Sequence, residues 1–271
     1  MRIVLVGPGR AGGSMARRLL DTGHTVVGVL ARRAEAAREA ADLFEADVLT
    51  WDGSMPAADL LLIAVRDDAI GEVAGRLAPL ASAAGGAVHL SGLTPVAALQ
   101  PLAATMPTGS FHPLQTLPDG EAGAARLAGA WVGITSEDAV FADRLFALAH
   151  GAGMHPFELD DECRAVYHAA AAAAANYTLT TLAMAERLFA AAGVPFAAAE
   201  PLVRAVIDNG FSMGPAAALT GPIARGDVGT VRAQLVAVAE ASPELAEDFR
   251  TLGRATARLA GTGESMEEAL R

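Results

Sequence analysis

The chain has 271 residues, of which 52% are hydrophobic, so it can fill the core of one large domain or two ordinary ones. Its formal net charge of −11 argues against nucleic acid or an anionic membrane surface as a partner. The single cysteine, Cys163, excludes an intramolecular disulfide framework. No apolar segment has the pattern of an export signal or a membrane span. We therefore expect a globular, cytoplasmic protein.

Short runs rich in Val, Leu and Ile alternate with helix-like segments through the first half of the chain. These strand-like runs lie at residues 2–7, 24–30, 46–50, 59–65, 86–92 and about 130–135. Alternation of this kind is typical of βαβ units around a parallel sheet. The expected fold class is therefore α/β, beginning with a doubly wound parallel sheet of the Rossmann type.

Strand-like runs disappear after about residue 158. The pattern then predicts one long helix, which acidic residues open at Asp160 and which Gly193 closes. At 1.5 Å per residue this helix would be about 45 Å long. Further helices are predicted at about 200–214, 227–241 and 243–261. We expect a nucleotide-binding domain over residues 1–158 and an all-α substrate and dimerisation domain over residues 159–271.

The stretch VLVGPGRAGGSM places Gly7, Gly9 and Gly12 in the spacing GxGxxG, after the first predicted strand and before a helix. In a dinucleotide site the first glycine permits the turn, the second lets the backbone approach the pyrophosphate, and the third packs the helix against the strand. The helix N-terminus then offers N–H groups to the phosphates. We expect these glycines, with Arg10 and Ala11, to bind a dinucleotide.

The residues at the end of the second predicted strand indicate whether the cofactor is NAD or NADP. An NAD site places Asp or Glu there to bind the ribose 2′-hydroxyl, whereas this chain reads GVLARRAEA and has Arg32 and Arg33. Guanidinium groups suit a 2′-phosphate because they donate paired, charge-assisted hydrogen bonds. Alternatively, the two arginines are solvated residues at a helix start. The sequence favours NADP as the cofactor.

Two further strand ends are expected to contact the cofactor. The first carries Ala64, Val65 and Arg66, and the second carries Ser91. Open α/β sheets bind ligands at the carboxyl ends of their strands. His89 lies inside the second of these strands, where we interpret it as a satisfied core histidine rather than a catalyst.

Six motifs in chain order carry a resemblance that covers most of the sequence. They read GxGxxG, ARR, IAVRDD, SFHPLQT, YHAAAAAAANY and LTGPIARGD. The chain resembles NADP-dependent reductases that join a Rossmann domain to a helical domain of the 6-phosphogluconate-dehydrogenase C-terminal type. It is similar to a branch near pyrroline-5-carboxylate reductases, deazaflavin-dependent NADP reductases and an alternative ketopantoate reductase. This resemblance implies a homodimer with interlocking helical domains and a substrate between the nucleotide domain and the long helix.

The chain departs from its better-known relatives at the proton donor. Hydroxyacid dehydrogenases and ketopantoate reductases have a lysine four residues before an asparagine, but Ala172 precedes Asn176 here, and the whole chain lacks lysine. On an α-helix, His168, Ala172, Asn176 and Thr180 share one face. One interpretation is a pocket wall, in which His168 donates the proton, Asn176 orients the substrate and Thr180 binds it. The alternative is a buried interface, in which these polar side chains form hydrogen bonds with backbone groups.

His112, in SFHPLQT, is the second candidate donor or a cofactor contact, although a histidine that stabilises the loop is an equal alternative. Gln115, close by, is a candidate substrate ligand. Tyr167 and Tyr177 flank the predicted helical stripe and are interpreted as packing residues.

Arg225, in LTGPIARGD, is a further candidate ligand for a substrate carboxylate. Alternatively, it caps a helix end or pairs with Asp227. Asp227 itself is a predicted N-cap of the helix that follows it.

These residues predict an NADPH-dependent reductase of a small carboxylate-bearing carbonyl compound, such as a ketopantoate-like 2-oxo acid, with no metal. An imine reductase of the pyrroline-5-carboxylate type is the near alternative. A non-catalytic protein that binds NADP is the alternative from a different class, and the absence of lysine favours it.

Overall fold

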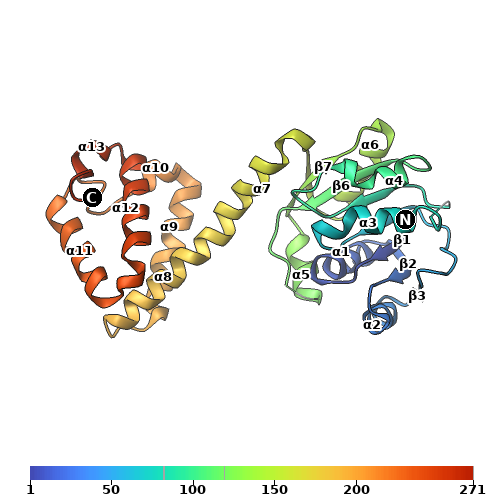
Figure 1. Cartoon of the computed structure of the whole chain (residues 1–271), viewed down its shortest axis with the longest axis horizontal. Coiled ribbons are helices and arrows are strands. Elements are labelled where there is room, and N and C mark those ends of the chain that lie inside the picture. Colours follow the sequence, from blue (N-terminus) through green and yellow to red (C-terminus); the bar gives the residue numbers. More distant parts are fainter. Residues whose placement is uncertain (82, 119, 271) are drawn as a thin grey trace. The chain divides into compact units, whose positions relative to one another are not determined.

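The computed structural model describes residues 1–81, 83–118 and 120–270. It divides into two compact units, Met1–Ala172 and Ala173–Arg271. The first unit is built around a sheet, and the described residues of the second form helices and loops (Figure 1). The predicted succession of an α/β fold and a helical region is therefore confirmed.

An eight-stranded sheet forms the centre of the first unit, with the strand order β3-β2-β1-β4-β5-β6-β7-β8. The strands are β1 (Arg2–Val6), β2 (Thr25–Leu30), β3 (Asp47–Val48), β4 (Leu60–Ile63), β5 (Ala87–His89), β6 (Thr108–Pro113), β7 (Trp131–Thr135) and β8 (His155–Glu158). Neighbouring strands are parallel except for the antiparallel pair β6 and β7. The sequence predicted neither this reversal nor β8, whose four residues HPFE lack a run of branched aliphatic side chains. The expectation that His112 lies on a loop after the sheet is wrong, because it lies within β6.

The helices of the first unit are α1 (Arg10–Asp21), α2 (Ala34–Phe44), α3 (Ile70–Leu77), α4 (Gln100–Ala103), α5 (Gly120–Leu127), α6 (Ala139–Gly151) and α7 (Arg164–Ala172). The sheet has a buried apolar cluster on each of its two faces. In β1, Ile3 and Leu5 join one core cluster, and Val4 and Val6 join the other. Because successive side chains of a strand point to opposite faces, a strand covered on both sides reads as a continuous apolar run.

The predicted long helix has an irregular middle. A 3₁₀ turn at Asp161–Cys163 leads into α7, a π-helical turn follows at Ala173–Tyr177, and α8 runs over Thr178–Ala191. Gly193, with φ of +72°, follows the last turn, as predicted for the end of a helix. The boundary between the two compact units falls at the start of the π-turn.

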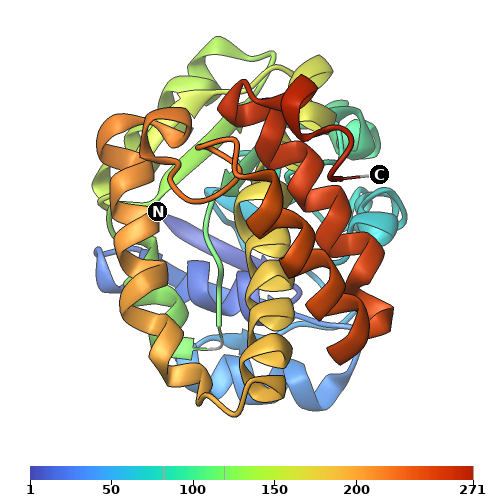
Figure 2. The same cartoon turned by 90° about the vertical axis from the view of Figure 1, so that its left-hand side faces the viewer.

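The second unit continues from α8 through α9 (Ala199–Met213), α10 (Pro215–Ala218), α11 (Val228–Ala241), α12 (Ala246–Ala260) and α13 (Gly263–Met266), seen facing the viewer in Figure 2. The Asp227 carboxylate accepts a hydrogen bond from Thr230 N at 3.0 Å, which confirms Asp227 as the N-cap of α11. The buried core of this unit is small and centres on Val231, Ala257 and Met266. No helix within the described residues is long and apolar enough to cross a membrane.

Two adjacent glycines of α1 give a matched test of the packing that holds the first turn of this helix. A Cβ at Gly12 would lie 2.3 Å from the carbonyl oxygen of Gly7, whereas a Cβ at Gly13 would meet no atom within 4 Å. We expect Gly12→Ala to lower the free energy of unfolding by about 1–3 kcal/mol through overpacking. Gly13→Ala should leave it unchanged or raise it by up to about 1 kcal/mol, because alanine favours helix. Equal stabilities in urea unfolding would contradict this packing.

Candidate active site

The turn between β1 and α1 gives each glycine of the GxGxxG motif a separate role. Gly7 has φ of +92°, and a Cβ there would lie 2.6 Å from the carbonyl oxygen of Ala64. A Cβ at Gly12 would lie 2.7 Å from the Cβ of Ala64, so this glycine permits close packing. Gly9 has no atom within 4 Å of such a Cβ. Only the second glycine therefore faces open space, where a ligand can approach the backbone.

The N-terminus of α1 is open to an anion. Gly9 is the N-cap, no side chain caps the helix, and its first turn contains no acidic residue. The first N–H groups of a helix have no partner within the helix, and they lie at the positive end of its dipole. Arg10 is exposed beside them and has no ion pair with any described residue. Gly9, Arg10, Ala11 and Gly12 therefore form an arrangement that fits a pyrophosphate.

The end of β4 lies directly against this turn. Ala64 N donates to Val6 O at 2.8 Å, and Cγ1 of Val65 would lie 3.0 Å from a Cβ at Gly7. The structure thus brings Ala64 and Val65 to the glycine turn. The Arg66 side chain, 84% exposed, instead forms an ion pair with Asp68 at 2.9 Å.

The end of β2 carries two exposed arginines. Arg32 and Arg33 precede α2, and neither has an ion-pair partner within the residues that the structure describes. The sequence analysis did not identify the contacts of the residue before them. Trp51 Nε1 donates to Ala31 O at 3.3 Å, and the Arg76 guanidinium lies 3.9 Å from the Trp51 ring centroid. Guanidinium groups without a carboxylate partner are suited to a phosphate ligand.

His112 lies at the same carboxyl edge of the sheet. The register pairs Val6 with Ile63, Ile63 with His89, and His89 with Ser110. His112 is two residues beyond Ser110, so it points to the same face of β6, past the carboxyl end of β5. This places it on the edge where the turn after β1 also lies.

The His112 ring is fixed by aromatic neighbours. Its Nδ1 lies 2.7 Å from the hydroxyl of Tyr167, and the two rings meet edge to face with centroids 5.4 Å apart. Phe157 contacts Tyr167 at a centroid distance of 5.9 Å. A Cβ at Gly92 would lie 2.7 Å from Nε2 of His112. Tyr167, predicted as a packing residue, therefore also makes a polar contact at the site.

Burial and nearby charge keep this pair electrically neutral. Burial, followed by the charges of His168 and Arg164, lowers the pKa of His112 to about 4, against a smaller opposing effect of Asp67. Burial raises the pKa of Tyr167 to about 12, against a smaller opposing effect of Arg164. At neutral pH the pair is consequently an imidazole and a phenol.

Arg164 links residues on or directly after β5, β6 and β7, and it was not anticipated from the sequence. Its side chain is 1% exposed; it donates to Ser91 O at 3.3 Å, to Thr135 Oγ1 at 2.6 Å and to Ser110 Oγ, and it forms an ion pair with Asp161. A buried guanidinium requires such partners, because its desolvation is costly. Ser91 belongs to this network. Its carbonyl oxygen accepts a hydrogen bond from Arg164, and its hydroxyl accepts one from Thr94 N at 2.9 Å.

His89 is fully buried, as expected of a core residue, but it is only half satisfied. Its Nδ1 accepts from Ser91 N at 3.2 Å, whereas its Nε2 has no hydrogen-bond partner in the described part of the chain. Burial, then the charge of Arg164, lowers the pKa of His89 to about 4. The interpretation as a fully satisfied histidine is therefore wrong at one ring nitrogen.

The residues of the predicted helical stripe lie on different helical segments. His168 is exposed on α7, Asn176 is exposed in the π-turn, and Thr180 Oγ1 on α8 donates to Asn176 O at 3.1 Å. A π-turn has i→i+5 bonds and adds a residue to one turn, so the assumed α-helical spacing from His168 to Thr180 is interrupted. π-Turns often occur at functional sites.

The two remaining candidates are exposed. Gln115 Oε1 accepts from Thr116 N at 2.8 Å. Arg225 forms no ion pair with Asp227, which instead accepts from Thr230, and the described residues give Arg225 no other carboxylate partner. Within the described ranges, no group of three or more His, Cys, Asp or Glu side chains is arranged to hold a metal ion.

Two family comparisons match successive parts of the chain. Residues 1–113 match a Rossmann-like domain, and residues 130–256 match a domain of unknown function, DUF2520. The chain therefore contains a segment similar to a Rossmann-like domain, followed by a segment similar to DUF2520. No curated protein matches it.

Solved structures share the fold over nearly the whole chain. A candidate NADP oxidoreductase from Bacteroides fragilis is 26% identical, with a TM-score of 0.80 over 95% of this chain and 98% of its own. A Streptomyces aurantiacus imine reductase is 20% identical, with a TM-score of 0.69 and full coverage of both chains. The 1-pyrroline-5-carboxylate reductase of Streptococcus pyogenes is 16% identical, with a TM-score of 0.60 over 96% and 98%. The predicted resemblance to NADP-dependent reductases with this two-part architecture is confirmed.

Proposed function

We propose that the protein is a cytoplasmic, NADPH-dependent oxidoreductase that reduces a small carboxylate-bearing carbonyl compound, with a ketopantoate-like 2-oxo acid as the best candidate. The observation that carries this proposal is the glycine turn, which leaves the α1 N-terminus open, together with two arginines that have no ion-pair partner among the described residues. The related Bacteroides fragilis protein, a candidate NADP oxidoreductase, supports the choice of cofactor.

The residues present fit NADPH. The backbone of Gly9–Gly12 would hold the pyrophosphate, Arg32 and Arg33 would hold the 2′-phosphate, and Ala64 and Val65 would line the path between them. When bound, NADPH supplies the hydride. The protein's own residues must orient the carbonyl group and give a proton to its oxygen.

A histidine supplies that proton in this proposal, since the chain has no lysine. Two histidines are candidates, His112 and His168. We favour His112 because its ring is held by Tyr167 at the carboxyl edge, whereas His168 is exposed and has no hydrogen bond to a described residue. Asn176 is proposed to orient the substrate.

Substrate contacts are proposed at Gln115, Thr180 and Arg225. Arg225 suits a carboxylate best, because its guanidinium is exposed and lacks an ion pair with any described carboxylate. An imine reductase remains the second candidate function, which the shared fold of the imine reductase and the pyrroline-5-carboxylate reductase supports.

NADPH should bind more tightly than NADH. Arg32→Ala and Arg33→Ala should each remove about 1.5–3 kcal/mol of NADPH binding, because each deletes a charge-assisted hydrogen bond, with little effect on NADH. Arg38→Ala, an equal charge change at an exposed position of α2, is the matched control. Equal affinities of the wild-type protein for both cofactors in isothermal titration calorimetry would rule out this selectivity.

Loss of nicotinamide absorbance with a panel of 2-oxo acids and cyclic imines tests the reaction itself. We expect turnover with a 2-oxo acid, and a loss of about 10²–10⁴ in rate for His112→Ala. A cyclic imine can enter as a protonated iminium, so the same variant should reduce imines with a much smaller loss. Tight NADPH binding without turnover of either class would favour the non-catalytic alternative.

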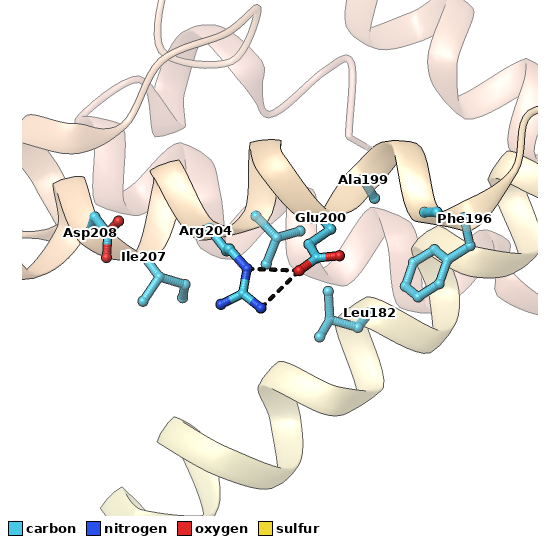
Figure 3. Close-up of a pocket in the computed structure, with 9 residues that line it drawn as sticks. Leu182, Phe196, Ala199, Glu200, Arg204, Ile207 and Asp208 are labelled. Atoms are coloured by element: carbon cyan, nitrogen blue, oxygen red, sulfur yellow. Dashed lines mark hydrogen bonds and ion pairs between the residues drawn. The ribbon is translucent and has the colours of Figure 1, made fainter.

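We further propose that the protein is a homodimer joined through its helical unit. Five apolar residues on α8 and α9 are more than half exposed: Leu179, Leu202, Val206, Phe211 and Met213. A groove of about 520 Å³ lies between these helices. Figure 3 shows the ion pair between Glu200 and Arg204, which line this groove. We propose that these exposed apolar side chains contact the second copy of the chain.

Sedimentation velocity tests this assembly. Phe211, which is 90% exposed, lies on the proposed interface, so Phe211→Glu should convert a dimer into a 27.6 kDa monomer. Val140→Glu introduces the same charge at a residue of α6 that is 73% exposed, and it should leave the dimer intact. A wild-type particle of 27.6 kDa at micromolar concentration would count against the dimer.

A further inference from the structure

We propose that Tyr167 and His112 form one proton-delivering pair, in which Nε2 of His112 gives its proton to the substrate oxygen and the Tyr167 hydroxyl resupplies the ring through Nδ1. This inference rests on the proposed reduction of a carbonyl group. Tyr167 acts here through His112 and is therefore a positioning and relay residue.

The geometry at both ring nitrogens of His112 suits this relay. The Tyr167 hydroxyl lies 2.7 Å from Nδ1, which is a normal distance for an O–H···N hydrogen bond. Edge contacts of Tyr167 with His112 and Phe157 fix the phenol ring. Nε2 has no hydrogen-bond partner among the described residues, and the glycine at 92 places no side chain over it. One ring nitrogen is thus held while the other remains available.

The charges around His112 and Tyr167 influence the protonation state of the two side chains. His168 and Arg164 on α7 disfavour a positive imidazolium at His112, and Asp67, in the 3₁₀ turn after β4, opposes them less strongly. With the pKa of His112 near 4 and that of Tyr167 near 12, the pair carries one phenol proton and one imidazole proton at neutral pH. If the phenol donates to Nδ1, the imidazole proton must be on Nε2.

The proton transfers balance. As the substrate carbonyl is reduced, its oxygen takes the Nε2 proton, and Nδ1 takes the phenol proton, so His112 stays neutral and Tyr167 becomes a phenolate. An alkoxide is a stronger base than a phenolate, so the transfer is favourable. After the product leaves, Nε2 takes a proton from water and Nδ1 returns its proton to the half-buried phenolate, which restores the starting tautomer. One solvent proton is consumed for each substrate molecule reduced.

Arg164 stabilises the phenolate without leaving its place. Its positive charge lowers the pKa of Tyr167 against the larger effect of burial. Hydrogen bonds to Ser91, Ser110 and Thr135 hold this guanidinium. It therefore offers a fixed charge to the anion that forms during the relay.

A tautomer measurement tests the pair without any substrate. In the ¹⁵N NMR spectrum of the wild-type protein with NADPH, His112 should be the neutral Nε2–H tautomer between about pH 6 and pH 8. Tyr167→Phe keeps the ring contacts but removes the donor, so Nδ1–H should become populated. A wild-type Nδ1–H tautomer, or a variant spectrum identical to that of the wild type, overturns the relay whether or not a substrate is known.

Kinetics test the relay once a carbonyl substrate is in hand. Tyr167→Phe should lower kcat about 10²-fold with unchanged KM and NADPH affinity. Its residual rate should rise as pH falls toward 4, because only the His112 imidazolium can then donate, whereas the wild-type rate stays flat from about pH 5 to pH 9. Tyr177→Phe makes the same change at the other tyrosine and should retain wild-type kcat. A flat profile at wild-type kcat in Tyr167→Phe overturns the proposal.

Discussion

Close packing of the first turn of α1 against the end of β4 is the constraint on which the proposed site depends. Gly7 and Gly12 have no room for a Cβ because the backbone and side chain of Ala64 occupy that space. This contact aims the α1 N-terminus at the carboxyl edge of the sheet and leaves Gly9 facing open space. The ends of β5 and β6 lie in register with the same edge, so a dinucleotide on the glycine turn would extend toward His112.

Arg164 imposes a second constraint on the same edge. A buried guanidinium is tolerated only where its donors are satisfied, and here an ion pair with Asp161 and bonds to groups after or on β5, β6 and β7 satisfy them. These bonds fasten the start of α7 to the sheet. Tyr167 follows Arg164 by three residues on the same helix, so the network also positions the phenol beside His112.

Local patterns were sufficient to predict much of the fold. The apolar runs marked most strands because strands covered on both faces need continuous apolar sequence, and the glycine spacing predicted the turn after β1. The reversal at β7 and the π-turn at Ala173–Tyr177 depend on tertiary packing, which leaves no periodic signal. The contact between Tyr167 and His112 joins residues 55 positions apart, so spacing within one helix could not reveal it. The local sequence DDECR also gives no sign that Arg164 is buried, because most of its partners lie on or directly after distant strands.

A crystal structure of the protein with NADPH tests the central claim most directly. The account predicts that the pyrophosphate lies on the N–H groups of Gly9–Gly12, the 2′-phosphate contacts Arg32 and Arg33, and the nicotinamide lies beside His112. A cofactor bound away from the glycine turn, or a 2′-phosphate without contact to either arginine, would contradict it.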